Sequence, residues 1–267
     1  MADRTHLLST ILGALFLPSA VLIVSAEQSD PVSSPPPRMV ATKLIRPGVN
    51  GVAGIPAAGS CLISEGVSRE RAASGAVSGG VTGFYECSLT SRFAVVAIPV
   101  HWTANSMAGG RGDAGFGAKY VFSREGSRHP TLALGYVAKA PIAAGNFGSG
   151  YADHKLTTYL EKTIAATRLT GNYVVKLEGH SNHHLWQRTW SFGASRPIHR
   201  RFGVATQAYY TGSSVAQFGG ILGAATYHIR PACAVHLGVE RGLSSGGMRT
   251  GVVWGVTALV PLRRSDN

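Results

Sequence analysis

A short segment at residues 180–184, His-Ser-Asn-His-His, places three imidazoles close together in the sequence. Imidazole nitrogens bind zinc and copper, so His180, His183 and His184 are candidate metal ligands. Their spacing is poor for a rigid site, and the segment lies between two runs of alternating residues, so we interpret it as a solvated loop. We therefore predict no bound metal and no other cofactor.

Two glycine-rich segments, at 109–115 and 145–150, have the glycine density of phosphate-binding loops. Neither ends in Gly-Lys-Ser/Thr or opens a helical pattern, so we interpret both as ordinary loops. Serine is plentiful, but no serine lies in the strand-to-helix Gly-x-Ser-x-Gly turn that exposes a hydrolase nucleophile. We predict no catalytic residues and expect that the protein is not an enzyme.

The composition disfavours two broad classes of protein. Charged residues make up only 14% of the chain, whereas glycine occurs 34 times among 267 residues. Soluble helical enzymes are richer in charged residues and leucine, and disordered chains are richer in charge. The net charge of +12 comes from basic residues scattered singly or in pairs where runs break. This distribution favours anionic lipid headgroups as partners and predicts no nucleic-acid binding.

The N-terminus has the pattern of an export signal. Arg4 precedes an apolar stretch at 7–24, and small residues at 24–26 resemble a cleavage site. An uncleaved membrane anchor is the alternative, but Pro18 and the cleavage-like residues favour removal. We predict a signal peptide at 1–26, an extended periplasmic leader at 27–58, and a folded domain at 59–267.

From residue 59 the chain alternates apolar with small or polar residues in runs of about ten residues, the length of a tilted membrane-spanning strand. The clearest run, at 234–240, places Val235, Leu237 and Val239 on one face. We predict about twelve strands, within a range of about 10 to 14. The predicted strands are 59–66, 80–88, 92–101, 113–122, 130–140, 155–164, 170–179, 185–195, 201–211, 218–229, 233–241 and 250–262.

A chain of hairpins without long apolar helices crosses a membrane only as a closed barrel, because lipid cannot pair with exposed backbone groups. The predicted fold class is therefore all-β, an antiparallel transmembrane β-barrel. The odd-numbered connections are mostly longer and richer in glycine than the even-numbered ones, as in the stretch 67–79. Since membrane barrels have short periplasmic turns and longer outer loops, we place both termini in the periplasm.

The polar face of the alternating strands should point inward and line a lumen. The alternative is a narrow interior filled by ion pairs and hydrogen bonds that does not conduct. The candidate lumen-lining residues are Lys119, Lys139, Lys176, Glu178, Gln207, His236 and Glu240. Aromatic residues near run ends are candidates for the interfacial girdles: Trp102, Tyr151, Trp186, Trp190, Tyr209, Tyr210 and Trp254.

Three cysteines, Cys61, Cys87 and Cys233, are spread far apart and form no disulfide framework. One bridge is compatible with this count, but the sequence does not assign it. Cys87 and Cys233 fall in or beside apolar runs, so we interpret these two as packed thiols.

Four stretches resemble the meta-pathway phenol degradation family of transporter-like outer-membrane β-barrels. They are residues 45–68 with Glu65, residues 84–102, the Gly-Asp and Gly-Ala-Lys-Tyr pattern of 112–122, and residues 129–156. Together the motifs extend over most of the mature chain. The family's Pro-Thr-Gly is replaced by Pro-Ile-Ala-Ala-Gly at 141–145, and the chain ends without a terminal aromatic residue.

The resemblance implies a Gram-negative outer-membrane channel, reached through the signal peptide, for passive passage of small molecules. The family's name suggests hydrophobic or aromatic compounds, but its substrate does not carry over to this chain. Expected partners are outer-membrane lipid, lipopolysaccharide and the barrel-assembly machinery. An outer-membrane lipid-modifying enzyme that uses the loop histidines is one alternative. A secreted soluble β-barrel that binds a ligand in its mouth is another.

Overall fold

The structure is a computed structural model, and it describes residues 51–72, 74–105, 108–143, 147–148, 150–179, 184–214, 216–244 and 248–262. The predicted signal peptide, and the leader as far as residue 50, lie outside this range. No helix within the described part of the chain is long and apolar enough to cross a membrane.

The described residues form an all-β structure. Its strands are β1 (Ser60–Ala72), β2 (Val77–Ser88), β3 (Phe93–Ile98), β4 (Trp102–Asn105), β5 (Gly109–Arg111), β6 (Ala114–Ser123), β7 (Thr131–Ala140), β8 (Asp153–Ile164), β9 (Thr167–Gly179), β10 (His184–Pro197), β11 (Phe202–Ser213), β12 (Gln217–Arg230), β13 (Cys233–Gly242) and β14 (Met248–Pro261).

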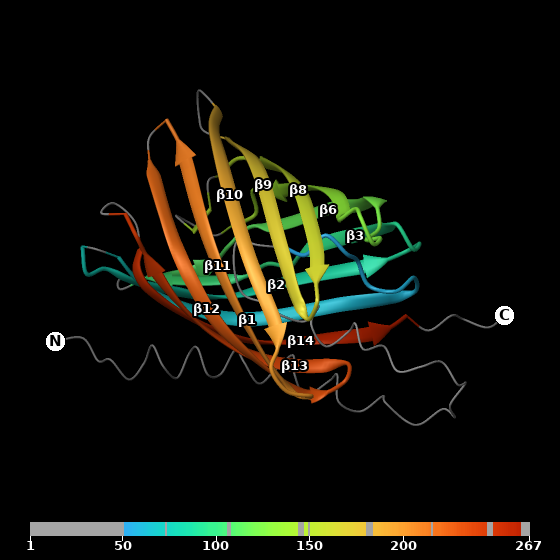
Figure 1. Cartoon of the computed structure of the whole chain (residues 1–267). Helices are drawn as coiled ribbons and strands as arrows, with labels where there is room; N and C mark the ends of the chain where they lie inside the picture. The colour runs from blue at the N-terminus through green and yellow to red at the C-terminus, as the bar shows by residue number, and fades with distance from the viewer. Residues whose placement is uncertain are drawn as a thin grey trace. The chain divides into compact units, whose positions relative to one another are not determined.

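The sheet closes because β1 pairs with both β2 and β14. Figure 1 shows β14 returning beside β1. Strand β4 continues β3, and β5 continues β6. The pairing of Trp102 with Arg111 keeps the register of the pairing of Phe93 with Tyr120. The result is a closed antiparallel barrel of 12 strands, and the prediction of about twelve is confirmed.

The interruption between β3 and β4 follows from Pro99. Proline has no N–H to donate to a ladder, so it weakens the strand where it occurs. On the neighbouring β2, the pairing stops at Tyr85 opposite Ala97 and resumes at Val81 opposite Trp102. The Pro99 ring occupies the gap beside Gly83, where an added Cβ would lie 2.6 Å from the proline Cγ.

The two faces of the wall differ as a membrane barrel requires. Along β11 the side chains of Phe202 and Val204 are exposed, whereas Gln207 and Thr211 are buried. Elsewhere in the described wall, exposed large apolar side chains and buried polar ones also alternate. A water-soluble barrel would have the opposite arrangement, so the outer surface needs an apolar solvent.

The connections separate the two ends of the barrel. The end with connections 89–92, 124–130, 165–166, 198–201 and 231–232 also holds the start of β1 and the end of β14, and we call it the turn end. The opposite end, with connections 73–76, 106–108, 141–152, 180–183, 214–216 and 243–247, is the loop end.

The predicted difference in length between the two sets of connections is smaller than expected. The stretch 67–79 was expected to be a long loop, but β1 runs to Ala72 and β2 begins at Val77. The length and glycine content of this stretch suggested a loop, yet the ladder with β14 continues through Arg69, Glu70 and Arg71. The longest connection, 141–152, does lie at the loop end.

Candidate lumen and its inner segment

The last part of the predicted leader lies inside the barrel. We call residues 51–56 the inner segment. Ala53 and Ile55 are buried in one apolar cluster with the inward-facing Ala94, Val121 and Ala133, and Tyr159 packs against it. The inner segment therefore occupies the part of the interior bordered by β3, β6, β7 and β8, near the turn end.

Lys119 on β6 anchors the inner segment by its backbone. Its ammonium group donates hydrogen bonds to the carbonyl oxygens of Val52, at 2.7 Å, and Gly54, at 3.0 Å. It also lies 3.2 Å from Glu86 Oε2, and 4.7 Å from the centre of the Tyr159 ring. An ammonium group has three protons to donate, so these three oxygen acceptors account for all of them.

A second anchor comes from β8 and β9. Glu161 Oε2 accepts a hydrogen bond from the Ala53 N–H at 2.9 Å, and its Oε1 lies 3.3 Å from Arg168 Nε. Asn172 donates through Nδ2 to the carbonyl oxygen of Gly51 at 3.1 Å. Buried backbone N–H and C=O groups without a hydrogen-bond partner lower stability. The hydrogen bonds from these side chains supply such partners, so an irregular segment can lie inside the barrel.

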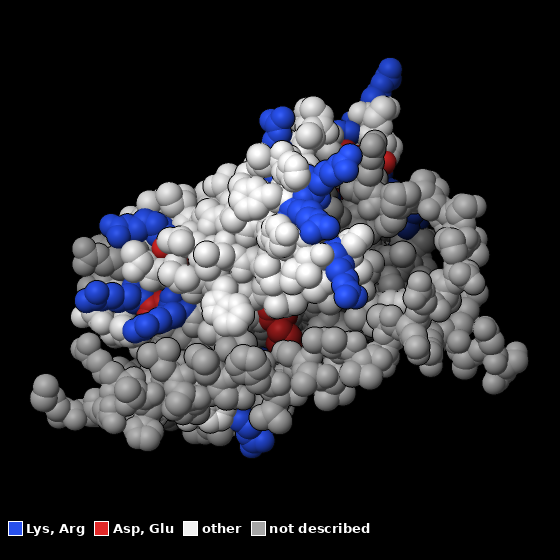
Figure 2. All heavy atoms as spheres, turned by 90° about the horizontal axis from the view of Figure 1, so that it is seen from below, with Lys and Arg blue, Asp and Glu red and all other residues white. Residues whose placement is uncertain are grey.

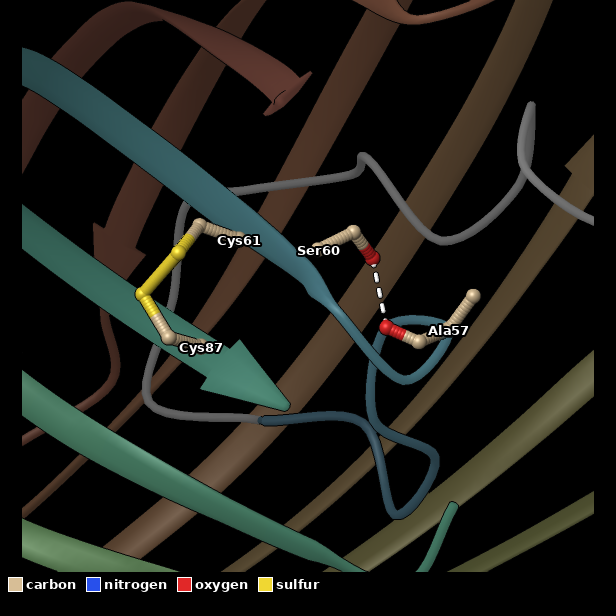
Figure 3. The surroundings of a disulfide bond; sticks show 4 residues. All are labelled: Ala57, Ser60, Cys61 and Cys87. Atoms are coloured by element: carbon tan, nitrogen blue, oxygen red, sulfur yellow. Dashed lines mark hydrogen bonds between the residues drawn. A yellow bond between two sulfur atoms is a disulfide. The ribbon is translucent and has the colours of Figure 1, made fainter. Parts of the chain in front are cut away.

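A tight turn leads from the inner segment to β1, as Figure 3 shows. Ser60 Oγ donates to the carbonyl oxygen of Ala57 at 2.6 Å. Gly59 has a φ of 75°, a conformation that favours glycine. Its N–H donates to Ser88, and its carbonyl oxygen accepts from Leu262. The turn is thus bonded to both neighbouring strands.

A disulfide bond lies beside this turn. Cys61 on β1 and Cys87 on β2 occupy directly opposed register positions and are joined, with their Cα atoms 4.0 Å apart (Figure 3). Our interpretation of Cys87 as a packed thiol was therefore wrong, because the sequence did not show which residues the strand pairing would oppose. Cys233 is a free cysteine.

A charge cluster lies on the inner wall toward the loop end. Lys139 Nζ lies 2.7 Å from Asp113 Oδ2 and 2.7 Å from Asp153 Oδ2. Lys176 reaches Asp153 at 3.2 Å and Glu178 at 3.4 Å. Each aspartate also accepts a backbone hydrogen bond, Asp113 from Ala143 and Asp153 from Gly179. The charges in this cluster largely neutralise one another.

The rest of the inner wall is mostly neutral. Hydroxyl pairs link adjacent strands, Ser64 with Thr257 at 2.9 Å and Thr189 with Thr211 at 2.9 Å. The His236 ring lies beside Gly255, where an added Cβ would be 2.6 Å from its Nε2. Strands β10 to β14 and β1 therefore present mainly hydroxyl and imidazole groups, together with the carboxylates of Glu70 and Glu240. The ion pairs lie on β2 and on the wall from Asp113 through β9.

All seven predicted lumen-lining residues lie on the inner face. Lys119, Gln207 and His236 are buried, whereas Lys139, Lys176, Glu178 and Glu240 are partly exposed. Sequence reasoning missed the groups that pair with them or hold the inner segment, namely Glu86, Asp113, Asp153, Glu161, Arg168 and Asn172. The signal was available for two of these, because Arg168 and Asn172 share strand parity with Lys176. Whether solute passes along this face stays a prediction.

The girdle prediction needs one correction. Trp102, Tyr151, Trp186, Trp190, Tyr210 and Trp254 are exposed. Tyr209 instead faces inward and donates a 2.5 Å hydrogen bond to Glu240 Oε1. Adjacent tyrosines in a strand point to opposite faces, so only one of Tyr209 and Tyr210 can face the lipid.

The histidine segment is only partly described. His180 and His183 lie outside the described residues, and His184 begins β10 with an exposed side chain. Among the described residues, no group of three or more His, Cys, Asp or Glu is arranged to hold a metal ion.

The fold is similar to solved bacterial barrels. Figure 2 shows Lys and Arg mainly on two sides of the face in view, and the mostly uncharged surface between them is interrupted by an acidic group. The COG4313 outer membrane channel from Pseudomonas putida F1 is 13% identical with a TM-score of 0.61, over 80% of this chain and 99% of that chain. The chain has the fold of an outer-membrane channel barrel.

Two porins show the same barrel likeness. The NanC porin is 10% identical with a TM-score of 0.56, and the KdgM porin is 8% identical with a TM-score of 0.54. Each alignment covers 74% of this chain and 98% of the porin. No family model matches the sequence, and no curated protein does. At these low sequence identities, the similarity shows a shared fold alone.

Proposed function

We propose that the protein is an outer-membrane channel that admits small molecules passively. The observation that carries this proposal is the closed wall with a polar inner face and an apolar outer face. Leu237 and Val239, for example, are 54% and 57% exposed beside the buried His236. A secreted soluble barrel would leave this apolar surface in water, so the wall favours a membrane position.

The inner segment is the proposed constriction. It has no strand partners, and side-chain contacts from Lys119, Glu161 and Asn172 hold it in the interior. A chain segment held by a few hydrogen bonds and a small apolar cluster is less stable locally than the wall around it. The size of the lumen near the turn end therefore depends on this segment.

The proposed solutes are small and neutral, with aromatic compounds as the first class to test. The lysine and arginine groups that line the β6 to β9 wall lie next to carboxylates, so this part of the inner face presents little unbalanced charge to select ions. The apolar cluster around Ile55 and Tyr159 adds a surface that favours uncharged molecules. The resemblance to the phenol degradation family supports the aromatic class.

Conductance and solute flux test the proposal. The full chain is inserted in planar bilayers and in liposomes, and swelling is compared between phenol-sized neutral solutes and charged solutes of similar size. Greater flux of the neutral solutes, with ion conductance that rises when residues 51–56 are replaced by Gly and Ser, is the expected result. Folded protein with neither conductance nor flux, or with lipid hydrolysis in the same vesicles, would contradict it.

A further inference from the structure

We propose that three arginines at the loop end of β1 and β13 bind the phosphates of lipid A in lipopolysaccharide. The inference rests on the proposed function, because it requires the loop end to face the outer leaflet. The longest connection lies at the loop end, whereas the start and end of the barrel lie at the turn end. This arrangement fits barrels with short periplasmic turns and longer outer loops.

Strand parity places the three side chains on the lipid-facing surface. On β13 the exposed Leu237 and Val239 share a face with Arg241, whereas Glu240 points inward to Tyr209. On β1 the inward Ser64 bonds to Thr257, so the residues at odd positions, including Arg69 and Arg71, face outward. All three arginines are exposed.

The register brings the arginines together. Arg71 and Arg241 both lie opposite Thr250 of β14, on either side of that strand. Two strand spacings separate their backbones by about 10 Å. Arg69 lies opposite Val252, two residues farther along the same face. Such a spread fits a ligand with more than one phosphate better than a single phosphate group.

These three guanidinium groups form no ion pair with a residue in the described part of the barrel. Glu70 and Glu240, next to the arginines in sequence, alternate with them and so belong to the opposite face. Glu65 shares the outer face of β1 and accepts a hydrogen bond from the Tyr85 hydroxyl at 2.5 Å. Guanidinium groups bind phosphate through paired, charge-assisted hydrogen bonds. The positive charge on this outer face is therefore available to an anionic ligand.

An apolar surface continues from the arginines toward the middle of the wall. Leu237 pairs with Trp254 and Val239 with Val252, and these four side chains are between 41% and 57% exposed. Acyl chains would lie along this surface while the phosphates meet the arginines. The occupant that fits both parts is a phosphorylated, multiply acylated glycolipid, and lipid A has this chemistry in the outer leaflet.

Binding of defined lipids to the purified full chain tests the proposal. Native mass spectrometry in a nonionic detergent compares bisphosphorylated lipid A, monophosphorylated lipid A and phosphatidylglycerol. The variant Arg69→Gln/Arg71→Gln/Arg241→Gln should bind bisphosphorylated lipid A at least about tenfold more weakly, because it loses several charge-assisted hydrogen bonds.

The matched control is Arg196→Gln/Arg200→Gln/Arg201→Gln, which removes the same charge from exposed residues at the turn end. It should bind lipid A within about twofold of the unmodified protein, since exposed charges that touch no ligand contribute little. The single variant Arg71→Lys should lie between the unmodified protein and the triple variant, because lysine keeps the charge but loses the paired geometry.

Three results would overturn the proposal. They are unchanged lipid A binding by the loop-end variant, an equal loss in the turn-end control, and equally tight arginine-dependent binding of phosphatidylglycerol. Each variant is checked for folding by the heat-dependent gel shift of a folded barrel. If the triple variant does not fold, the single variant Arg71→Gln replaces it. If the loop-end variant still binds lipid A and conducts normally, the lipid A proposal is wrong but the channel proposal stands. If the unmodified protein does not conduct, the channel proposal is wrong, and the lipid-binding result is judged separately.

Discussion

Lys119, on β6, donates a 2.7 Å hydrogen bond to the carbonyl oxygen of Val52, in the segment that precedes β1. This bond joins the barrel wall to the chain inside it. The same ammonium lies beside Glu86, so one side chain both holds the inner segment and neutralises a buried carboxylate. The two roles can be separated by mutation.

Lys119→Met should raise single-channel conductance and lower the free energy of unfolding by about 3–5 kcal/mol, because Glu86 loses its buried partner. The double variant Lys119→Met/Glu86→Gln removes that unpaired charge. It should recover much of the stability while keeping the higher conductance. Planar-bilayer recordings and urea unfolding in vesicles measure the two effects, and a double variant with normal conductance would show that Lys119 does not hold the constriction.

The backbone at Gly255 approaches both Glu65 and the His236 ring, so it has no room for a side chain. A Cβ there would lie 2.4 Å from the Glu65 carbonyl oxygen. Gly255→Ala should therefore lower the free energy of unfolding by about 1–3 kcal/mol. Gly223→Ala is the matched control, since nothing lies within 4 Å of its added Cβ. Equal unfolding midpoints for the two variants would contradict the described packing.

The disulfide should leave one reactive thiol in the denatured, unreduced protein and three after reduction, because only Cys61 and Cys87 are bridged. Reduction should lower the free energy of unfolding by about 2–4 kcal/mol. Cys233→Ser should lose the reactive thiol yet keep the full effect of reductant. Thiol titration and urea unfolding with and without dithiothreitol check both points, and three reactive thiols before reduction would exclude the bridge.

A charged side chain on the lipid-facing wall should lower the stability of the barrel more, the closer it lies to the middle of the membrane. Leu237 is 54% exposed in the middle of β13, and Leu243 is 67% exposed just beyond the strand. Leu237→Arg should cost about 2–4 kcal/mol of stability in a bilayer, whereas Leu243→Arg should cost no more than about 1 kcal/mol. Urea unfolding from phospholipid vesicles compares them. If the cost at Leu243 equals that at Leu237, the membrane position proposed for β13 is wrong.

Local pattern was a good guide to the wall. Each predicted run overlaps an observed strand, and parity placed Lys119, Gln207 and His236 on the inner face. Two local interpretations were wrong. Arg69 and Arg71 lie in a stretch predicted to be a loop but extend β1, and Tyr209 was grouped with the girdle although its neighbour Tyr210 takes the outward position.

The sequence by itself determined the strands, their approximate number and which side chains face inward, because these depend on a period of two residues along a single strand. The remaining features were determined by closure of the sheet into a barrel. The bridge between Cys61 and Cys87, the meeting of Asp113 and Asp153 at Lys139, and the position of residues 51–56 inside the barrel all depend on inter-strand register and on contacts across the interior. No local pattern encodes those contacts, since each joins groups that only the closed sheet brings together.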